Sequence, residues 1–294
     1  MATAAGDVIS VIMPTWNAAT TIDAQLEALA AQEVDGPWEL VVSDNGSGDA
    51  TVARVRAWAS RFPSLTVVHA SGPRGAGHAR NVGVRAARGD RLLTCDADDV
   101  VMPGWVARLG HALTDRCLVA GTLDRSGLNP EYAVMWAHGW RALADGPRVS
   151  FAYLPFAATA NLGFRRELFD AIGGFDSSLR RASDVDFGWR ALLAGARLEM
   201  VPDAVVAYRL PATLRGLFAK GYADGLVAPL LYDRFESRGL RRQPMREVLR
   251  SYRWLVRHVL SLRHDGPAAR SWAYDGGMRV GRIVGSIRHR TVFL

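Results

Sequence analysis

The stretch DRLLTCDADD, residues 90–99, is the most informative part of this chain. An apolar run with the length of a buried strand ends at three carboxylates, Asp96, Asp98 and Asp99. Like charges at this density repel one another unless a cation lies among them. Hard carboxylate oxygens suit magnesium or manganese rather than zinc. The alternative interpretation is an ordinary acidic turn, because Asp is favoured in turns and helix caps.

Around this stretch, the first hundred residues alternate between strand-like and helix-like patterns. Short apolar runs predict strands at Val8–Met13, Trp38–Val42, Leu65–Val68 and Arg91–Cys95, with helices between them. The alternation predicts an α/β fold with a doubly wound, mostly parallel sheet flanked by helices. Ligands bind at the carboxyl ends of the strands in such sheets. The polar turns that follow these strands should therefore gather at one edge.

The pattern continues beyond residue 100, and the chain divides near residue 208. We expect a helix after Pro103 to about Leu113, strands at Cys117–Ala120, Ala158–Phe164 and Arg197–Val201, helices at Arg165–Ala171 and Asp184–Ala194, and a turn at Pro202–Asp203. The segment Asp124–Ser150 carries no assignable pattern. We expect one α/β domain over residues 1–208 and a basic helical region over residues 209–294.

Positive charge is concentrated in that second region. The whole chain has a net charge of +7, whereas residues 209–294 hold 17 Lys and Arg against 6 Asp and Glu, a net charge of +11. The first 208 residues are therefore acidic overall. No nucleic-acid recognition motif accompanies the basic region, so we expect no nucleic-acid partner.

Cysteine content and hydropathy indicate the cellular compartment in which the protein is found. Cys95 and Cys117 are too few for a disulfide framework and are typical of buried thiols in a reducing compartment. The chain shows no signal-peptide pattern and no run of about 18 uncharged apolar residues, so we expect no transmembrane helix. These features predict a cytoplasmic protein, with attachment at the inner face of the membrane as an alternative.

Six blocks of residues occur in a fixed order along the chain. They are Val11–Asn17, Val42–Ser47, Gly77–Gly83, Asp96–Asp99, Asn161–Arg166 with Gly173–Asp176, and Asp184–Asp186 with Arg190. Together they resemble the family 2 glycosyltransferases of the GT-A fold over roughly Val8–Tyr208. The resemblance implies an inverting enzyme that moves one sugar from a nucleoside-diphosphate sugar to an acceptor hydroxyl.

The resemblance also implies where the nucleotide would bind. Backbone and side-chain groups of Pro14, Thr15 and Trp16 would border the base. Asp44 would read uracil, which makes UDP the expected nucleotide, with thymidine as the alternative because its base edge is similar. The alternative is that Asp44 only opens a turn.

Two residues of the third block are expected near the donor. Gly77 lets the backbone pass close to a ligand. Arg80 can offer a charged fork to the nucleotide or its phosphates. A surface ion pair is the alternative for Arg80.

The resemblance implies that the Asp96-Ala97-Asp98 triplet would hold the donor and its cation. Asp96 would lie near the ribose, and Asp98 would bind Mn²⁺ or Mg²⁺, which neutralises the departing diphosphate. Asp99 would support these ligands. Many relatives place a His that joins the metal site where this chain has Tyr208, which puts the need for the metal in doubt.

Asp184 matches the acid of the family's Glu-Asp motif and is the expected general base, although Ser183 replaces the Glu. The alternative is an N-cap residue without chemistry. Asp186 is the runner-up for the base. The candidate contacts to acceptor or donor sugar are Asp176, Asp186, Trp189 and Tyr208.

Two other functions compete with this interpretation. A sugar-phosphate nucleotidyltransferase needs a Gly-rich, basic signature after the first strand, and residues 14–19 do not resemble one. A non-catalytic nucleotide-sugar-binding protein would have lost the acids that this chain keeps. The Gln-x-x-Arg-Trp signature of processive synthases is also absent, because Glu247 stands in place of the Trp.

Residues 245–262 form an amphipathic pattern. Its apolar positions are Met245, Val248, Leu249, Tyr252, Leu255, Val256, Val259 and Leu260. This face could pack on the rest of the protein or on a second subunit, or it could lie on an anionic membrane and meet a lipid-linked or cell-envelope acceptor. We expect the acceptor site in the segment 124–156 and this basic region.

Overall fold

A computed structural model of the chain describes residues 8–131, 148–149 and 151–294, and its contacts form two compact units. Among the described residues, the first unit comprises 8–124, 148 and 154–208. The second comprises 125–131, 149, 151–153 and 209–294, so it takes in more than the expected 209–294 region. Part of the segment expected to meet the acceptor, 132–147 and 150, lies outside the described residues.

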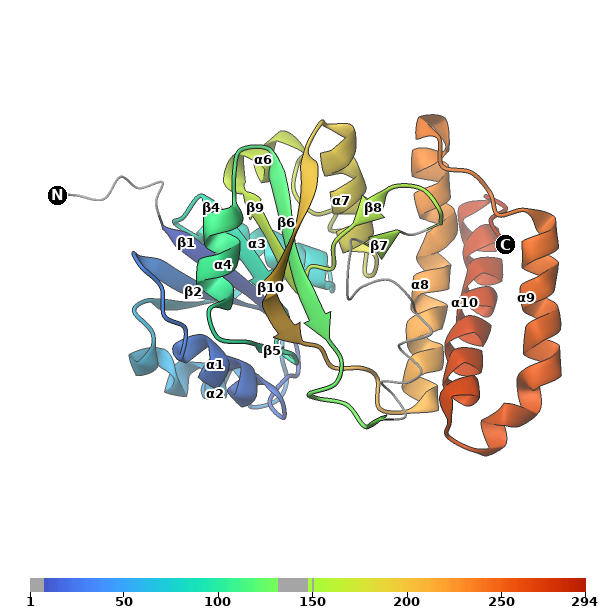
Figure 1. Cartoon of the computed structure of the whole chain (residues 1–294), viewed down its shortest axis with the longest axis horizontal. Coiled ribbons are helices and arrows are strands. Elements are labelled where there is room, and N and C mark those ends of the chain that lie inside the picture. Colours follow the sequence, from blue (N-terminus) through green and yellow to red (C-terminus); the bar gives the residue numbers. More distant parts are fainter. Residues whose placement is uncertain (1–7, 132–147, 150) are drawn as a thin grey trace. The chain divides into compact units, whose positions relative to one another are not determined.

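The first unit is built on a sheet with the strand order β3-β2-β1-β4-β9-β6-β10-β5 (Figure 1). Its strands are β1 (Ile9–Thr15), β2 (Trp38–Asp44), β3 (Leu65–His69), β4 (Arg91–Cys95), β5 (Val100–Val101), β6 (Cys117–Asp124), β9 (Asn161–Arg165) and β10 (Arg197–Ala207). The strands β3, β2, β1 and β4 are parallel, and so are β6 and β10. β9 lies antiparallel between β4 and β6. The expected α/β fold with a mostly parallel sheet is therefore confirmed.

Helices and short turns connect these strands. They are α1 (Ile22–Ala30), α2 (Thr51–Ala57), the 3₁₀ turn η2 (Ala59–Arg61), α3 (Ala76–Ala86), α4 (Trp105–Ala112), α6 (Arg166–Ala171) and α7 (Ser183–Leu193). β7 (Arg148–Val149) and β8 (Pro155–Phe156) form a separate two-stranded sheet.

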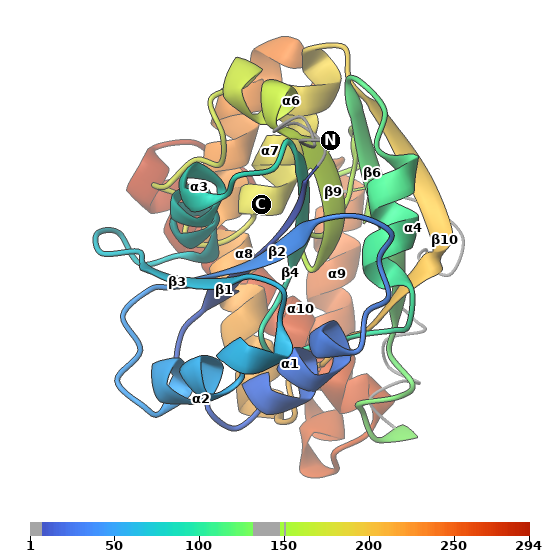
Figure 2. The same ribbon diagram turned by 90° about the vertical axis from the view of Figure 1, so that its left-hand side faces the viewer.

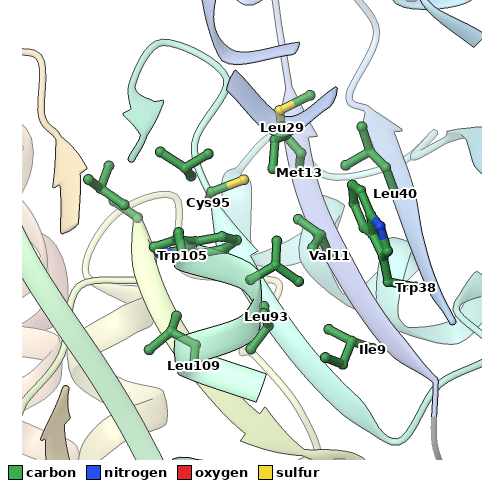
Figure 3. Close-up of a cluster of buried hydrophobic side chains, with 14 of the residues drawn as sticks. Ile9, Val11, Met13, Leu29, Trp38, Leu40, Leu93, Cys95, Trp105 and Leu109 are labelled. Atoms are coloured by element: carbon green, nitrogen blue, oxygen red, sulfur yellow. The ribbon is translucent and has the colours of Figure 1, made fainter. Parts of the chain in front are cut away.

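One face of the large sheet is covered by α1 and α4. Val11 of β1 and Leu93 of β4 point to this face and form a buried cluster with Leu26 of α1 and Trp105 of α4. Figure 3 shows the indole of Trp105 among the side chains of this cluster. The indole Nε1 also donates a hydrogen bond of 2.8 Å to Asn161 Oδ1, which ties α4 to β9.

The opposite face is covered by α3, α6 and α7, and Figure 2 shows α3 on the other side of β1 and β2 from α1 and α2. Ile12 packs there in a cluster with Val84 of α3 and Phe187 of α7. Successive side chains of a strand point to opposite faces, so β1 is buried on both sides. Near-continuous apolar runs are typical of such doubly covered strands.

β10 departs from the prediction. The predicted turn at Pro202–Asp203 is wrong: the register shifts between Val201 and Val205, and the strand continues to Ala207. Proline lacks an amide hydrogen, and within sheets it is confined to edges and irregularities of this kind. Asn161 Nδ2 donates to the Ala204 carbonyl at 2.9 Å, which holds the bulge against β9.

At the amino ends of the strands, a buried carboxylate joins three segments. Glu39 of β2 accepts hydrogen bonds from Ser10 Oγ (2.7 Å) and from the Arg88 N–H (2.6 Å) and Nε (2.9 Å). Burial raises the pKa of Glu39, but these bonds and the charge of Arg88 outweigh it and hold the pKa below 4.5. The ionised carboxylate therefore stabilises the fold.

The second unit contains α8 (Leu214–Phe235), η3 (Glu236–Arg238), α9 (Met245–His258), η4 (Val259–Arg263) and α10 (Pro267–His289). α8 and α10 approach so closely that glycines replace side chains where they meet. A Cβ on Gly281 would lie 2.2 Å from the Tyr222 carbonyl oxygen, and one on Gly225 would lie 2.2 Å from that of Met278. The glycines at this interface are Gly221, Gly225, Gly277, Gly281 and Gly285.

Of the predicted apolar face of residues 245–262, only Val248 is fully buried. Among the described residues, no helix has both the length and the apolar content needed to cross a bilayer.

The Glu39 network makes stability depend on pH. Because the folded pKa lies below 4.5, its contribution is full above the unfolded pKa and is lost as the pH falls through the folded value. Glu39→Gln should lower the free energy of unfolding by about 1–3 kcal/mol at neutral pH. Urea denaturation at a series of pH values should show this deficit shrinking in acid. A deficit that does not shrink as the pH falls well below the usual pKa of a glutamate would contradict the assignment.

The helix packing predicts an asymmetry between two neighbouring glycines. Gly281→Ala should lower the free energy of unfolding by about 1–3 kcal/mol, because backbone atoms of α8 must move. Gly276→Ala is the matched control, since its Cβ would meet only Trp272 ring atoms, the nearest at 3.2 Å. We expect the control to stay within about 1 kcal/mol of the wild type. Equal losses for both variants would argue against backbone contact between the helices.

Candidate active site at the carboxyl edge of the sheet

The carboxyl ends of β1, β2 and β4 meet at one edge of the first unit. Thr15 pairs with Asp44 in the register of β1 and β2. Ile12 pairs with Thr94, so Asp96 leaves β4 at the level of Pro14. The residues expected to bind the nucleotide-sugar from these three strands thus lie along the same edge, as the parallel register requires.

The acidic loop, residues 96–99, follows β4 at this edge. Asp96, Asp98 and Asp99 each offer a carboxylate oxygen within 4.8 Å of the others. Asp96 is half-buried, Asp98 is exposed and Asp99 is buried, while Ala97 is buried beneath the loop. An all-oxygen donor set of this kind suits a hard divalent cation. Asp98 presents its carboxylate to solvent, so it is the acid most accessible to an entering ion.

Arg80 supplies positive charge to this loop. Its guanidinium is buried, Nη2 lies 2.5 Å from Asp96 Oδ1, and its Cζ lies 5.9 Å from the centre of the Phe175 ring. Arg80 forms an ion pair, as the alternative expected, but its guanidinium is buried rather than at the surface, and its contact to the nucleotide stays a prediction. Arg80 lowers the repulsion among the three acids, and it fixes the side chain of Asp96.

The backbone of the acidic loop is held by α1, a contact that the sequence did not predict. Gln25 is fully buried; its Nε2 donates to the Asp96 carbonyl at 2.9 Å, and its Oε1 accepts from the Val101 N–H at 2.9 Å. One side chain thus spans the loop from its first residue to β5. The sequence signal for this contact was a Gln on the apolar face of a helix, because a buried amide needs hydrogen-bond partners.

A thiol lies directly beneath the loop. Cys95 is fully buried at the end of β4. Burial first, and then the negative charges of Asp96 and Asp99, raise the pKa of this thiol far above its usual range. Cys95 is therefore a neutral packing residue rather than a nucleophile or a metal ligand.

Asp44 forms a turn in this structure. Its carboxylate accepts hydrogen bonds from the N–H groups of Gly46 (3.2 Å) and Ser47 (3.1 Å) and lies 3.4 Å from Thr15 Oγ1. The side chain is almost fully buried. These bonds are those of the turn-forming alternative. They also fix the carboxylate at the end of β2, where the base contact remains a prediction.

Trp16 is the exposed member of the expected base-binding segment, with 53% of its surface accessible. The guanidinium of Arg74 lies 5.2 Å from its ring centre. Thr15, by contrast, is buried at the end of β1. The segment therefore offers an aromatic face rather than a hydroxyl to a molecule at this edge.

α3 connects the acidic loop to the start of α7. Gly77 and Arg80 are three residues apart and so share a face of α3. Arg80 pairs with Asp96. A Cβ on Gly77 would lie 3.0 Å from the Cβ of Ser183, the first residue of α7. Asp184 follows immediately and is half-buried, and its Oδ1 accepts from the Val185 N–H at 3.0 Å.

Two of the candidate sugar contacts are core residues. Asp186 has no accessible surface and lies 2.7 Å from the Nη2 of Arg190, which also donates to the Ile172 and Gly174 carbonyls. Trp189 is equally buried and donates to the Leu154 carbonyl at 2.9 Å. Neither side chain has surface with which to touch a substrate, so these expectations are corrected, and with them that of Asp186 as base.

The other two candidates keep accessible surface. Asp176 accepts from the N–H (2.8 Å) and Oγ (2.7 Å) of Ser178, which orders its loop. Tyr208 follows Ala207, the residue of β10 that pairs with Val100 of β5. This register carries Tyr208 toward the acidic loop, where the resemblance expects a metal-site residue.

Comparison with known proteins gives a family match and several relatives. The family model described as Glycosyl transferase family 2 matches residues 10–173. The pre-mycofactocin glycosyltransferase of Mycobacterium tuberculosis is 29% identical over 232 residues, which cover 76% of this chain but 47% of that protein. The succinoglycan biosynthesis protein ExoO of Rhizobium meliloti is 27% identical over 265 residues, covering 83% and 74%. The chain thus spans about half the length of the mycobacterial relative.

Solved structures show the same fold. The mannosyltransferase PcManGT from Pyrobaculum calidifontis, in complex with GDP-Man and Mn²⁺, superposes with a TM-score of 0.65 at 21% identity, over 94% of this chain and 86% of that one. S. aureus TarS 1–349 in complex with UDP-GlcNAc gives a TM-score of 0.52 at 19% identity, over 96% and 92%. The expected GT-A architecture is confirmed by these likenesses.

Gln25 should control the cation affinity of the acidic loop. Gln25→Leu removes both bonds to the loop backbone and should weaken Mn²⁺ binding about 10-fold or more. Gln32→Leu is the matched control, because Gln32 makes the same two kinds of bond to the Met102 carbonyl and the Val106 N–H. Isothermal titration with Mn²⁺ should distinguish the two variants. Equal weakening in both would reduce Gln25 to a general stabilising residue.

Proposed function

This chain belongs to glycosyl transferase family 2, and from that premise we propose that it transfers a single sugar from a nucleoside-diphosphate sugar to an acceptor hydroxyl with inversion. UDP is the expected nucleotide. The acceptor is proposed to be a lipid-linked or cell-envelope glycan, or a natural product. PcManGT was solved with GDP-Man and TarS with UDP-GlcNAc, so nucleotide-sugars are the donor class that the likeness supports.

The observation that carries this proposal is the position of α3. One face of this helix pairs with Asp96 through Arg80 and packs on Ser183 through Gly77. Asp98 and Asp184 are 86 residues apart in sequence. The segments that carry them nevertheless contact the same turn of α3. A donor diphosphate near Asp98 and a base at Asp184 can then serve one reaction centre.

In the proposed reaction, a carboxylate oxygen of Asp184 takes the proton from the acceptor hydroxyl. The acceptor oxygen attacks the anomeric carbon, and the bond from that carbon to the diphosphate breaks. The electron pair leaves with the nucleoside diphosphate. A single displacement of this kind inverts the anomeric configuration. Asp184 lies in the first turn of α7.

The acids of the loop fit a divalent cation, Mn²⁺ or Mg²⁺. Asp98 would hold it, with the carboxylates of Asp96 and Asp99 within 4.8 Å. A bound cation supplies positive charge to a departing diphosphate. Arg80 and Gln25 act before any ion binds, since they fix the side chain of Asp96 and the backbone of the loop.

A nucleotide-sugar-binding protein without catalysis remains the second candidate. Such a protein would use the same edge of the sheet and the same acids, and the same class of donor would bind to it. The half-buried carboxylate of Asp184 at the start of α7 favours catalysis, because binding of a donor does not require it. Release of nucleoside diphosphate in the presence of acceptor discriminates between the two.

Asp184→Asn should remove proton transfer and keep donor binding. We expect kcat to fall about 100- to 10,000-fold, while the donor Kd changes by less than about 2-fold. Turnover is measured as released nucleoside diphosphate, after thermal-shift screening of nucleotide-sugars with Mn²⁺ has found the donor. Asp170→Asn, at an exposed position of α6, is the control and should behave as the wild type. Full turnover in Asp184→Asn would remove this residue from its role.

Asp98→Asn tests the cation separately. We expect Mn²⁺ binding to weaken at least about 10-fold, because one anionic ligand is lost. The Asp170→Asn variant should again be unchanged. Wild-type Mn²⁺ affinity in Asp98→Asn would place the ion elsewhere.

A further inference from the structure

α9 carries a stripe of apolar side chains that the protein does not cover. Met245, Leu249, Val256 and Leu260, just beyond the end of the helix, are 60%, 56%, 76% and 61% exposed. Their spacing of four, seven and four residues places them along one side of a helix. Surface apolar residues are common singly, but a continuous row of large ones marks an interaction surface.

A row of arginines runs beside this stripe. Arg246, Arg250, Arg253 and Arg257 are all exposed. Arg246, Arg250 and Arg257 each come one residue after a member of the apolar stripe, which is a rotation of about 100° around the helix. The four positive charges are opposed within α9 by a single acid, Glu247.

A different side of α9 attaches it to the second unit. Val248 is buried, the Leu255 carbonyl accepts from Trp272 Nε1 at 2.7 Å, and the Tyr252 ring lies 5.7 Å from the guanidinium of Arg279. The exposed stripe is therefore not needed to hold α9 on α10. α10 also leaves apolar residues open, since Val280, Ile283 and Ile287 are exposed in a row of their own.

We propose that the exposed face of α9 docks on the surface of an anionic lipid bilayer. The apolar stripe would enter the headgroup region while the arginines lie at the level of the lipid phosphates, as in helices that lie parallel to a membrane. Each basic side chain near an anionic surface adds to the attraction. The net charge of residues 209–294, +11, has the sign that such a surface attracts.

Charge favours this occupant over a second copy of the chain. A symmetric dimer brings the same patch of both subunits together. On this face it would set arginines against arginines, with one Glu in α9 to oppose them. A bilayer that contains phosphatidylglycerol offers apolar depth and negative charge to the same helix.

The first test is co-sedimentation of the full chain with vesicles. Vesicles of phosphatidylcholine mixed with phosphatidylglycerol should bind the protein at about 50 mM salt and release most of it at about 500 mM, because the charges are then screened. Vesicles of phosphatidylcholine alone should bind it at least about 10-fold more weakly. Equal binding to both compositions, or no binding to either, would overturn the proposal.

Paired variants locate the surface. Arg250→Gln with Arg253→Gln should weaken binding about 30-fold, taking about 5-fold per charge. Leu249→Ser with Val256→Ser should weaken vesicle binding at least about 10-fold, because serine has little apolar surface to bury in the bilayer. The matched control, Arg56→Gln with Arg85→Gln, removes two exposed charges from α2 and α3 and should change binding less than about 2-fold.

The outcomes separate this proposal from its rivals. If the control weakens binding as much as the α9 arginine variant does, net charge rather than this surface is responsible, and the proposal fails. If the α9 variants change the oligomeric state in sedimentation and leave vesicle binding intact, the face is a subunit interface. Thermal unfolding of each variant checks that it folds. Asp98→Asn should bind vesicles like the wild type, so failure of the glycosyl-transfer proposal would leave this one standing.

Discussion

Electrostatic repulsion within the acidic loop is the constraint to which the surrounding structure responds. Three carboxylates lie within 4.8 Å of one another at the end of β4. Such a cluster opposes folding unless positive charge and fixed hydrogen bonds offset it. Arg80 supplies the charge from α3, and Gln25 holds the loop backbone from α1. The loop is thus clamped from both faces of the sheet, and Asp98 stays exposed to solvent.

α3 has a second task that follows from its place on the sheet. Its first turn carries Gly77 against Ser183 and Arg80 against Asp96, so the helix fixes the start of α7 relative to the acidic loop. A Cβ at Gly77 would lie 3.0 Å from the Cβ of Ser183, which is tighter than an ordinary contact. The Asp186–Arg190 ion pair also holds α7 in place, since Arg190 donates to the Ile172 and Gly174 carbonyls of the loop after α6. Asp184 is therefore presented by a rigid helix end rather than by a free loop.

In the second unit, α8 and α10 pack on each other, whereas α9 keeps a surface exposed to solvent. α8 and α10 meet through glycines and backbone atoms, and a small apolar cluster that includes Leu217 and Tyr274 lies beside this contact. α9 attaches through one side only and keeps large apolar residues and arginines at the surface. An amphipathic pattern is ambiguous from sequence because a core and a membrane both bury apolar surface. The exposed fractions of Met245, Leu249, Val256 and Leu260 show that this stripe is not part of the core of the chain.

The sequence by itself determined the first four strands, the helices between them and the edge at which the acids of the loop gather. Those features follow from short-range periodicity and from the rule that parallel strands share a carboxyl edge. Tertiary structure alone decided which polar residues are buried and what they hold. Gln25 contacts the carbonyl of Asp96 across 71 residues, Arg80 is enclosed rather than exposed, and Asp186 and Trp189 belong to the core. Pro202 lies in a bulge where the register of β10 against β6 shifts, and Asn161 of β9 donates to the Ala204 carbonyl there. Long-range contacts fix these outcomes, and the local pattern shows at most that Gln25, on an apolar helix face, needs partners, without showing which ones.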